Sequence, residues 1–223
     1  MIDSKYITHQ REPFYEIVNK YLREDSIVLD IGAGDGSFSK YFNRDDFYLF
    51  DGNISNINIL KNKFKNVYYG KLPRLPFEDN FFDIIHCSHV IEHLNPHELY
   101  ETLIEIDRCL KNDGYIIIST PLLWNGFYGD LSHVKPYNPE VLLKYFSNFL
   151  GNTLTREHIS KNYIKKELIY RYREVDLLEN LYNTKNNFLI FLIFKTLNFL
   201  YKLGLRKYIK SGYTLVIQKQ NNI

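Results

Sequence analysis

A glycine-rich turn between a predicted strand and a predicted helix constrains this chain more than any other feature. Residues 27–29 form a short apolar run, and residues 30–36 read DIGAGDG before helical spacing resumes. Glycine adopts positive φ without steric cost and lets a ligand approach the backbone where a Cβ would stand in the way. In this strand–turn–helix context the turn indicates a nucleotide-binding α/β fold, although tight turns of this kind also serve packing alone.

The chain alternates between strand and helix patterns as far as about residue 150. Short apolar runs predict strands at 27–29, 47–50, 67–69, 82–87 and 115–120. Apolar residues at helical spacing lie between them, and a further predicted helix over 14–22 precedes the first strand. This alternation predicts a parallel sheet with helices on both faces.

The pattern changes after Gly151. Residues 155–186 are polar with helical spacing in parts, and residues 187–204 are largely apolar before a final predicted strand at 213–217. The apolar stretch is too short and interrupted for a membrane span, which needs roughly 20 apolar residues. It fits a helix buried against the domain, or an amphipathic helix that lies on a membrane or covers the active site. We predict one domain over 1–223, with 155–210 as a helical insertion or lid before the last strand.

The charge balance gives no argument for nucleic-acid binding. With 28 basic and 26 acidic side chains the formal net charge is +2, whereas nucleic-acid-binding domains usually carry a clear basic excess. The two cysteines form no C-x-x-C pair, so neither a disulfide framework nor a cysteine zinc site is predicted. The first residues lack the apolar stretch of a secretory signal. We expect a cytoplasmic protein. An alternative is a cytoplasmic protein that contacts the membrane surface through residues 187–204.

Two carboxylates follow the first two predicted strands. Asp30 ends the first strand, where it can accept hydrogen bonds from an ammonium group or from backbone donors. Asp51 ends the second, about 20 residues after the turn, where an acid can bind both hydroxyls of a ribose. The alternative for either residue is a helix N-cap.

Four motifs follow one another within residues 26–121. They are 30–36 (DIGAGDG), 50–53 (FDGN), 75–83 (LPFEDNFFD) and 109–114 (CLKNDG). Together they resemble the class I S-adenosylmethionine-dependent methyltransferases, in particular the methyltransferase type 11 group. The resemblance implies a Rossmann-like three-layer α/β sandwich with a mostly parallel seven-stranded sheet whose last strand is antiparallel. A NAD-binding fold is the main competitor, but it usually has a longer G-x-G-x-x-G turn, and residues 37–39 supply no later glycine.

The resemblance implies S-adenosylmethionine as the cofactor. Asp30 would anchor its methionine end, the glycines would approach its backbone, and Asp51 would hold its ribose. The family often has an acidic residue for the adenine amino group where this chain has Lys71-Leu72, so adenine would be bound there by backbone groups and apolar contacts. The predicted cofactor residues are Asp30, Gly32, Ala33, Gly34, Gly36, Asp51, Gly52, Lys71, Leu72, Ser88 and His89.

The segment 88–94 (SHVIEHL), directly after the fourth predicted strand, brings together three groups that can bind a metal. His89, Glu92 and His93 fall at i, i+3 and i+4, on one face of a helical turn. In the family that the chain resembles, I-E-H-L also occurs without a metal, where the histidine shapes the pocket floor. H-x-x-E-H further matches an inverted zinc-peptidase motif, although the surrounding sequence is that of a methyltransferase.

Metal-dependent relatives offer another interpretation of this segment. The ubiquinone-biosynthesis O-methyltransferase and the small-RNA 3′-terminal 2′-O-methyltransferase carry E-x-x-E-H here, and a later histidine joins the site of the RNA enzyme. By that similarity His89, Glu92, His93 and His133 would hold a divalent metal. The extra histidine favours Mn²⁺, Fe²⁺ or Zn²⁺ over Mg²⁺.

A loop after the fifth predicted strand, 128–137 (YGDLSHVKPY), lies on the side where ligands bind in such sheets. It resembles the D-x-x-H-x-R/K-P-Y/F loop of small methyltransferases linked to surface-polysaccharide synthesis. We predict His133 as the general base or a metal ligand, oriented by Asp130, with His93 as a further catalytic residue. The alternative is a purely structural loop histidine.

These features predict an O-methyltransferase for a hydroxyl of a sugar, nucleotide-sugar or glycan. Trp124, Tyr128 and Tyr137 are candidates for stacking on the sugar ring, or else members of the core. A second hypothesis is metal-dependent O-methylation of an RNA ribose or a small-molecule phenol, and a third is a catalytically idle, methyltransferase-like binding module. We expect a small-molecule or glycan acceptor as the partner and no nucleic acid, and the sequence assigns no oligomeric state.

Overall fold

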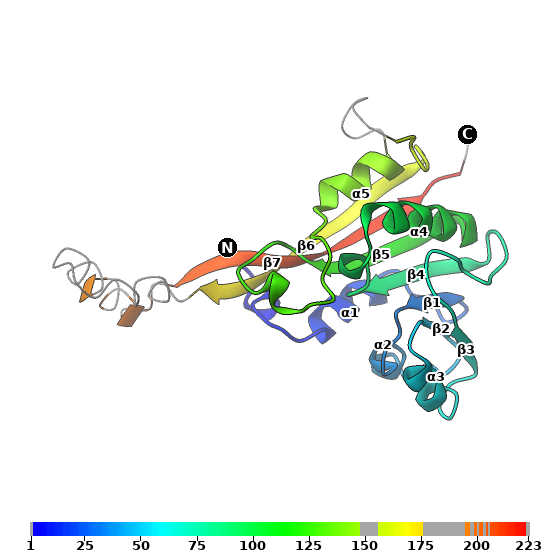
Figure 1. The fold of residues 1–223 in the computed structure, drawn as a ribbon, viewed down its shortest axis with the longest axis horizontal. Coiled ribbons are helices and arrows are strands. Elements are labelled where there is room, and N and C mark those ends of the chain that lie inside the picture. Colours follow the sequence, from blue (N-terminus) through cyan, green and yellow to red (C-terminus); the bar gives the residue numbers. More distant parts are fainter. Residues whose placement is uncertain are drawn as a thin grey trace.

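The computed structural model describes residues 2–147, 156–175 and 206–221, together with 195–196, 199, 201–202 and 204. These residues form an α/β domain (Figure 1). Its strands are β1 (Val28–Ile31), β2 (Tyr48–Asp51), β3 (Asn66–Tyr69), β4 (Phe82–Ser88), β5 (Leu110–Pro121), β6 (Tyr163–Val175) and β7 (Lys207–Lys219). Its helices are α1 (Glu12–Asn19), α2 (Ser37–Tyr41), α3 (Ile54–Leu60), α4 (Pro96–Cys109) and α5 (Pro139–Phe146). Short 3₁₀ turns are η1 (Ser4–Tyr6), η2 (Ile91–His93) and η3 (Phe127–Gly129).

The strands form one seven-stranded sheet in the order β3-β2-β1-β4-β5-β7-β6. Strands β1 to β5 are parallel to one another, and β7 is antiparallel to both of its neighbours, β5 and β6. The predicted fold, a mostly parallel seven-stranded sheet with an antiparallel last strand, is confirmed. The carboxyl ends of β1, β2, β4 and β5 therefore lie along one edge, where the loops that carry the predicted site begin.

Helices cover both faces of the sheet, as the alternation predicts (Figure 1). On one face α4 and α5 contribute Leu103 and Phe146 to a core that contains Ile116 of β5. On the other face α1 contributes Phe14 to a core that contains Ile117, and α2 and α3 pack there as well. Successive side chains of a strand point to opposite faces, so two neighbouring isoleucines of β5 serve the two cores. The central strands are buried on both sides.

The predicted helical insertion over 155–210 is wrong for the residues that the structure describes at its two ends. Residues 163–175 form β6, and β7 begins at residue 207; the two strands pair in antiparallel register. As the edge strand of the sheet, β6 pairs with a strand on one side only, has an isolated bridge to Ile7 on the other, and carries charged side chains on its exposed surface. A bulge at Lys166 also interrupts its alternation. The sequence of β6 therefore lacks the apolar run that marks the central strands.

Most of the apolar segment 187–204 lies outside the described residues. Its predicted role as a lid, a buried helix or a membrane-surface helix stays a prediction. Within the part of the chain that the structure describes, no helix combines the length and hydropathy needed to cross a bilayer.

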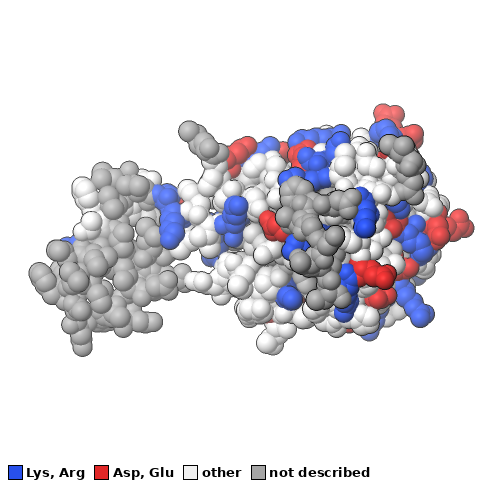
Figure 2. Space-filling model, turned by 90° about the horizontal axis from the view of Figure 1, so that it is seen from above, with Lys and Arg blue, Asp and Glu red and all other residues white. Residues whose placement is uncertain are grey.

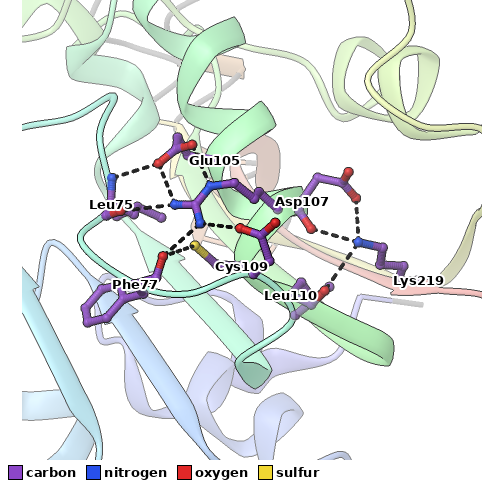
Figure 3. Close-up of polar contacts among 9 residues, drawn as sticks. Leu75, Phe77, Glu105, Asp107, Cys109, Leu110 and Lys219 are labelled. Atoms are coloured by element: carbon purple, nitrogen blue, oxygen red, sulfur yellow. Dashed lines mark hydrogen bonds and ion pairs between the residues drawn. The ribbon is translucent and has the colours of Figure 1, made fainter.

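Arg108, near the end of α4, ties the loop between β3 and β4 to this helix. Figure 3 shows Leu75 and Phe77 of the loop facing Glu105 of the helix. Its guanidinium donates to the backbone carbonyls of Leu75, over 3.1 Å, and Phe77, over 2.8 Å. It also pairs with the carboxylates of Glu105 and Asp79. The hydrogen bonds to Glu105 and then to Asp79 raise the pKa of Arg108 above its ordinary value. One side chain thus fixes a loop that has no strand or helix of its own.

We expect Arg108→Ala to lower the free energy of unfolding by about 2 kcal/mol, because partly buried carbonyls lose their donor. Chemical denaturation measures this loss. The control is Arg23→Ala, since the Arg23 side chain is exposed and forms only long ion pairs. A loss for Arg108→Ala no larger than that for Arg23→Ala would contradict the structural role of the network.

Candidate active site

A pocket of about 270 Å³ opens at the carboxyl ends of β1 and β2. Five of the predicted cofactor residues line it: Gly32, Asp51, Gly52, Lys71 and Leu72. The rest of the lining, which the sequence did not predict, is Ile31, Phe50, Gly70, Val90 and Leu94. Apart from Leu94, each of these residues is next in sequence to a predicted cofactor residue. Extending the predicted set by one residue on each side would therefore have found them. The pocket joins apolar surface to one carboxylate.

Asp51, at the end of β2, fixes the second strand to the glycine turn. Its Oδ2 accepts a hydrogen bond from the backbone N–H of Gly34 over 2.8 Å, and its Oδ1 accepts one from the N–H of Asn53 over 2.7 Å. Each carboxylate oxygen can accept more than one hydrogen bond. The carboxylate is therefore held in place and keeps acceptor capacity for two hydroxyls of a ligand.

The glycine turn is packed against a neighbouring side chain at Gly32 and has free space beside it at Gly34. Gly32 and Gly34 have φ of 72° and 56°, which favours glycine. A Cβ on Gly32 would collide with the side chain of Val90, so glycine allows the loop after β4 to close against the turn. A Cβ on Gly34 would have its nearest neighbour 3.9 Å away, so the backbone there faces open space. Ala33 is buried between them, and Gly36 precedes α2 in the left-handed conformation.

Asp30 is buried in β1 and pairs with His86 of β4. Nδ1 of His86 donates to Oδ1 of Asp30 over 2.7 Å, and the imidazole stacks on Phe38 with 3.9 Å between the ring centroids. Asp30 does not line the pocket. Its contact with the methionine end of a cofactor stays a prediction, whereas its bond to His86 joins β1 to β4 beneath the turn.

We expect Asp30→Ala to lower the free energy of unfolding by about 3 kcal/mol, because it leaves the His86 donor buried without a partner. Chemical denaturation at neutral pH measures the loss. Asp35→Ala is the matched control, since Asp35 lies in the same turn with an exposed side chain. A loss below about 1 kcal/mol, the upper range for an exposed ion pair, would show that the buried pair does not stabilise the fold.

Ser88 ends β4, and His89 begins the loop that follows. His89 has a φ of 56°, and its N–H donates to the carbonyl of Ser119 in β5. Its Nδ1 donates to Oε1 of Glu92 over 3.1 Å, while Oε2 of Glu92 accepts from the hydroxyl of Thr120. Burial raises the pKa of Glu92, but its hydrogen bond and charge interaction with His89 bring it below its ordinary value. Glu92 is thus a buried carboxylate with both oxygens engaged.

His93 and His133 lie together, with 5.0 Å between their ring centroids. Nδ1 of His93 donates to the carbonyl of Ser132 over 3.0 Å, and Nδ1 of His133 donates to the carbonyl of Phe127 over 2.6 Å. A neutral imidazole that donates through Nδ1 accepts through Nε2. Each ring therefore keeps one nitrogen for a proton or a metal. Ligand atoms of Glu92, His93 and His133 all lie within 4.8 Å of one another.

Two predicted roles in this region are wrong. Asp130 does not orient His133, because its exposed carboxylate accepts from the N–H and the hydroxyl of Ser132 in a local turn, and a backbone carbonyl holds the His133 ring. His89 does not join the other three predicted metal ligands. Its Nδ1 is bonded to Glu92 and its Nε2 accepts from Arg171. The structure therefore reduces the predicted ligand set to three residues.

Comparison with known proteins decides the family. A family model described as a methyltransferase domain matches residues 6–161. An uncharacterised protein of Methanocaldococcus jannaschii is 30% identical over 182 residues, which cover 75% of this chain and 78% of that protein. The chain belongs to the methyltransferase-domain family. An uncharacterised methyltransferase of Schizosaccharomyces pombe is 26% identical to this methyltransferase over 117 residues, or 44% of this chain and 40% of that protein.

Solved structures share the fold of the methyltransferase. An S-adenosylmethionine-dependent methyltransferase from Archaeoglobus fulgidus has a TM-score of 0.64 at 24% identity, with 97% of both chains covered. The YcgJ protein of Bacillus subtilis has a TM-score of 0.61 at 16% identity, and the match covers 96% of this chain and 100% of that chain. The predicted enzyme class, a methyltransferase, is confirmed, and the family implies the predicted S-adenosylmethionine cofactor. The hypothesis of an idle binding module is set aside.

The residues at this edge of the sheet fit this cofactor. Asp51 would accept from the ribose hydroxyls, Lys71-Leu72 would lie beside the adenine, and the open backbone at Gly34 would admit the methionine end. S-adenosylmethionine supplies a methyl group that is already activated for transfer, so holding an acceptor in line accounts for much of the catalysis. What the chain must add is position and, for a hydroxyl acceptor, a group that takes the proton.

Proposed function

We propose that this methyltransferase methylates a hydroxyl of a sugar or glycan. The observation that carries the proposal is the pair of histidines, His93 and His133, each of which keeps Nε2 as an acceptor. A hydroxyl must lose its proton as it accepts a methyl group, and imidazole is the side chain best suited to take it near neutral pH. His133 acts as the base, and His93 lies beside it.

A cavity of about 310 Å³ adjoins the same loop. Residues 124–126 line one side of it, directly ahead of Phe127, whose carbonyl holds the His133 ring. Arg173 of β6 and Ile209 of β7 line the other side. An aromatic and apolar surface with a few polar groups is typical of sites for small ligands. The guanidinium of Arg173 lies over the indole of Trp124, with its Cζ 4.1 Å from the ring centroid, so the two side chains together offer a sugar an aromatic surface and hydrogen-bond donors for its hydroxyls.

The other two aromatic candidates differ in position. Tyr128 is exposed, and its ring packs edge-on against Phe127. Tyr137 is buried, and its hydroxyl donates to the carbonyl of Leu94. Tyr137 therefore belongs to the core, and Tyr128 is the second aromatic available to an acceptor.

Glu92, His93 and His133 also support a second candidate function, metal-dependent O-methylation of an RNA ribose or a phenol. Two imidazoles and a carboxylate form a donor set that suits Mn²⁺, Fe²⁺ or Zn²⁺. Each oxygen of Glu92 accepts one hydrogen bond and keeps further acceptor capacity, so the geometry is compatible with a bound metal as well as with a metal-free base. On the face shown in Figure 2, basic and acidic side chains are interspersed, which favours a small acceptor over RNA.

Transfer of a labelled methyl group from S-adenosylmethionine to a panel of acceptors tests the proposal. The panel contains simple sugars, nucleotide sugars, catechol and a short RNA, each with EDTA and with Mn²⁺. We expect labelled methyl ethers in the sugar class, in equal yield with EDTA and with Mn²⁺. Label confined to RNA or catechol, or abolished by EDTA, would favour the second candidate and overturn the first.

A further inference from the structure

Arg171 of β6 reaches from the edge of the sheet to the loop after β4. Its Nη1 donates to Nε2 of His89 over 3.2 Å, and its guanidinium lies 4.5 Å from the centroid of the Phe14 ring in α1. Between Arg171 and Tyr172 the pairing skips Ser211, so a bulge in β7 lies opposite this point of β6. Gly212 lies opposite on β7 and has no side chain to block it. The local structure thus directs one arginine inward.

The guanidinium of Arg171 is largely enclosed, yet it forms no ion pair with any acid in the described part of the chain. Burial, and then repulsion from the nearby Arg11, lowers the pKa of Arg171 to about 10, so the side chain remains a cation at neutral pH. The carboxylate of Glu92 attracts it but is bonded to His89 and Thr120. Enclosing a cation without a bonded counter-charge costs free energy. Such groups occur where a ligand supplies the opposite charge.

Arg171 adjoins both halves of the active site. Its partner His89 precedes Val90, which lines the cofactor pocket and touches Gly32. Arg173, two residues further along β6, lines the proposed sugar cavity. An anionic group bound to Arg171 would therefore adjoin both the cofactor and the acceptor.

We propose that Arg171 and Arg11 bind an anionic group of the methyl acceptor, a carboxylate or a phosphate, so that the acceptor is an acidic sugar or a sugar phosphate. His89 and Phe14 hold the guanidinium of Arg171 in place. A planar guanidinium held this way can donate two parallel hydrogen bonds to a carboxylate or phosphate. Arg11, directly before α1, adds the second positive charge. The inference rests on the sugar O-methylation proposed above.

Nuclear magnetic resonance of the S-adenosylhomocysteine complex tests the site with simple probes. The probes are glucuronate and its neutral counterpart glucose, and the signal is the imidazole of His89. We expect glucuronate to shift this signal saturably and glucose to leave it unchanged. Because hydrogen bonds to charged groups contribute about 1.5–3 kcal/mol, Arg171→Gln should weaken glucuronate binding about tenfold or more, and Arg11→Gln should weaken it as well.

The matched control is Arg156→Gln. Arg156 also stacks on an aromatic ring, that of Tyr100, but it is exposed and lies against α4, where it donates to the carbonyl of Pro96. We expect it to bind glucuronate as the wild type does. Equal shifts with glucose and glucuronate, or an equal loss in Arg156→Gln, would overturn the proposal. Thermal melting of each variant excludes unfolding, and since Arg171→Gln removes an enclosed charge we expect no fall in its melting temperature.

The same variant shows whether the anion belongs to the cofactor instead. S-adenosylhomocysteine carries a carboxylate, and 5′-methylthioadenosine lacks it. We expect Arg171→Gln to bind both as the wild type does. If it weakened S-adenosylhomocysteine about tenfold and left methylthioadenosine unchanged, the anion would be the cofactor carboxylate and the acceptor proposal would be overturned. Failure of the wild type to bind S-adenosylhomocysteine would instead contradict the methyltransferase function itself.

Discussion

We expect Asp51→Asn to weaken the binding of S-adenosylhomocysteine about 100-fold. The carboxylate of Asp51 is held at the end of β2 by the N–H groups of Gly34 and Asn53, and it lines the pocket. Hydrogen bonds to a charged group contribute about 1.5–3 kcal/mol each, and about 1.4 kcal/mol corresponds to tenfold in affinity. Loss of the charge that would accept from two ribose hydroxyls accounts for the expected change. Isothermal titration calorimetry measures it.

The control for this variant is Asp35→Asn, in the same glycine turn. Asp35 is exposed and bonded to Ser37 and Lys40, outside the pocket lining. Its affinity for S-adenosylhomocysteine should equal that of the wild type. Equal affinities for Asp51→Asn and the wild type, with both proteins folded, would show that Asp51 does not hold the ribose.

We expect His133→Asn to reduce kcat about 10²–10³-fold and to leave the affinity for S-adenosylhomocysteine unchanged. General-base catalysis by a positioned side chain contributes about 10²–10⁴-fold. The ring of His133 is held by its Nδ1 bond to the carbonyl of Phe127 and lies against His93, outside the cofactor pocket. The labelled-methyl assay with the best sugar acceptor measures kcat, and calorimetry measures affinity.

His97→Asn is the matched control for the base. His97 lies at the start of α4 with an exposed side chain, so its substitution should leave kcat unchanged. Undiminished turnover in His133→Asn would remove His133 from the catalytic role. A loss of turnover that Mn²⁺ deepens or restores would identify it as a metal ligand instead of a base.

The parts of this site that the sequence predicted are those with local signals. Gly32 and Gly34 need positive φ, and Asp51 ends an apolar run, so each can be assigned from a few neighbouring residues. The parallel sheet also follows from the alternation of strands and helices, because its central strands are apolar on both faces. For these features the structure adds distances to residues that were already identified.

The parts that the sequence missed depend on contacts between distant segments. His86 is 56 residues from Asp30, and Arg171 is 82 residues from His89. Neither pair corresponds to a spacing motif, so a single sequence does not reveal it. β6 was missed because an edge strand with a bulge has no continuous apolar run. The prediction that Asp130 orients His133 was wrong for a different reason. The Asp130 carboxylate accepts hydrogen bonds from the nearby Ser132 instead, within a short local turn.

The most direct test of the central claim is calorimetric titration of the wild-type chain with S-adenosylhomocysteine. We predict one site per chain with a dissociation constant of about 1–100 μM, equivalent to roughly −5 to −8 kcal/mol. Binding to the folded state should also raise the melting temperature as the ligand concentration rises. A folded protein that shows neither heat of binding nor a rise in melting temperature would contradict the assignment of the pocket at Gly32 and Asp51 to this cofactor.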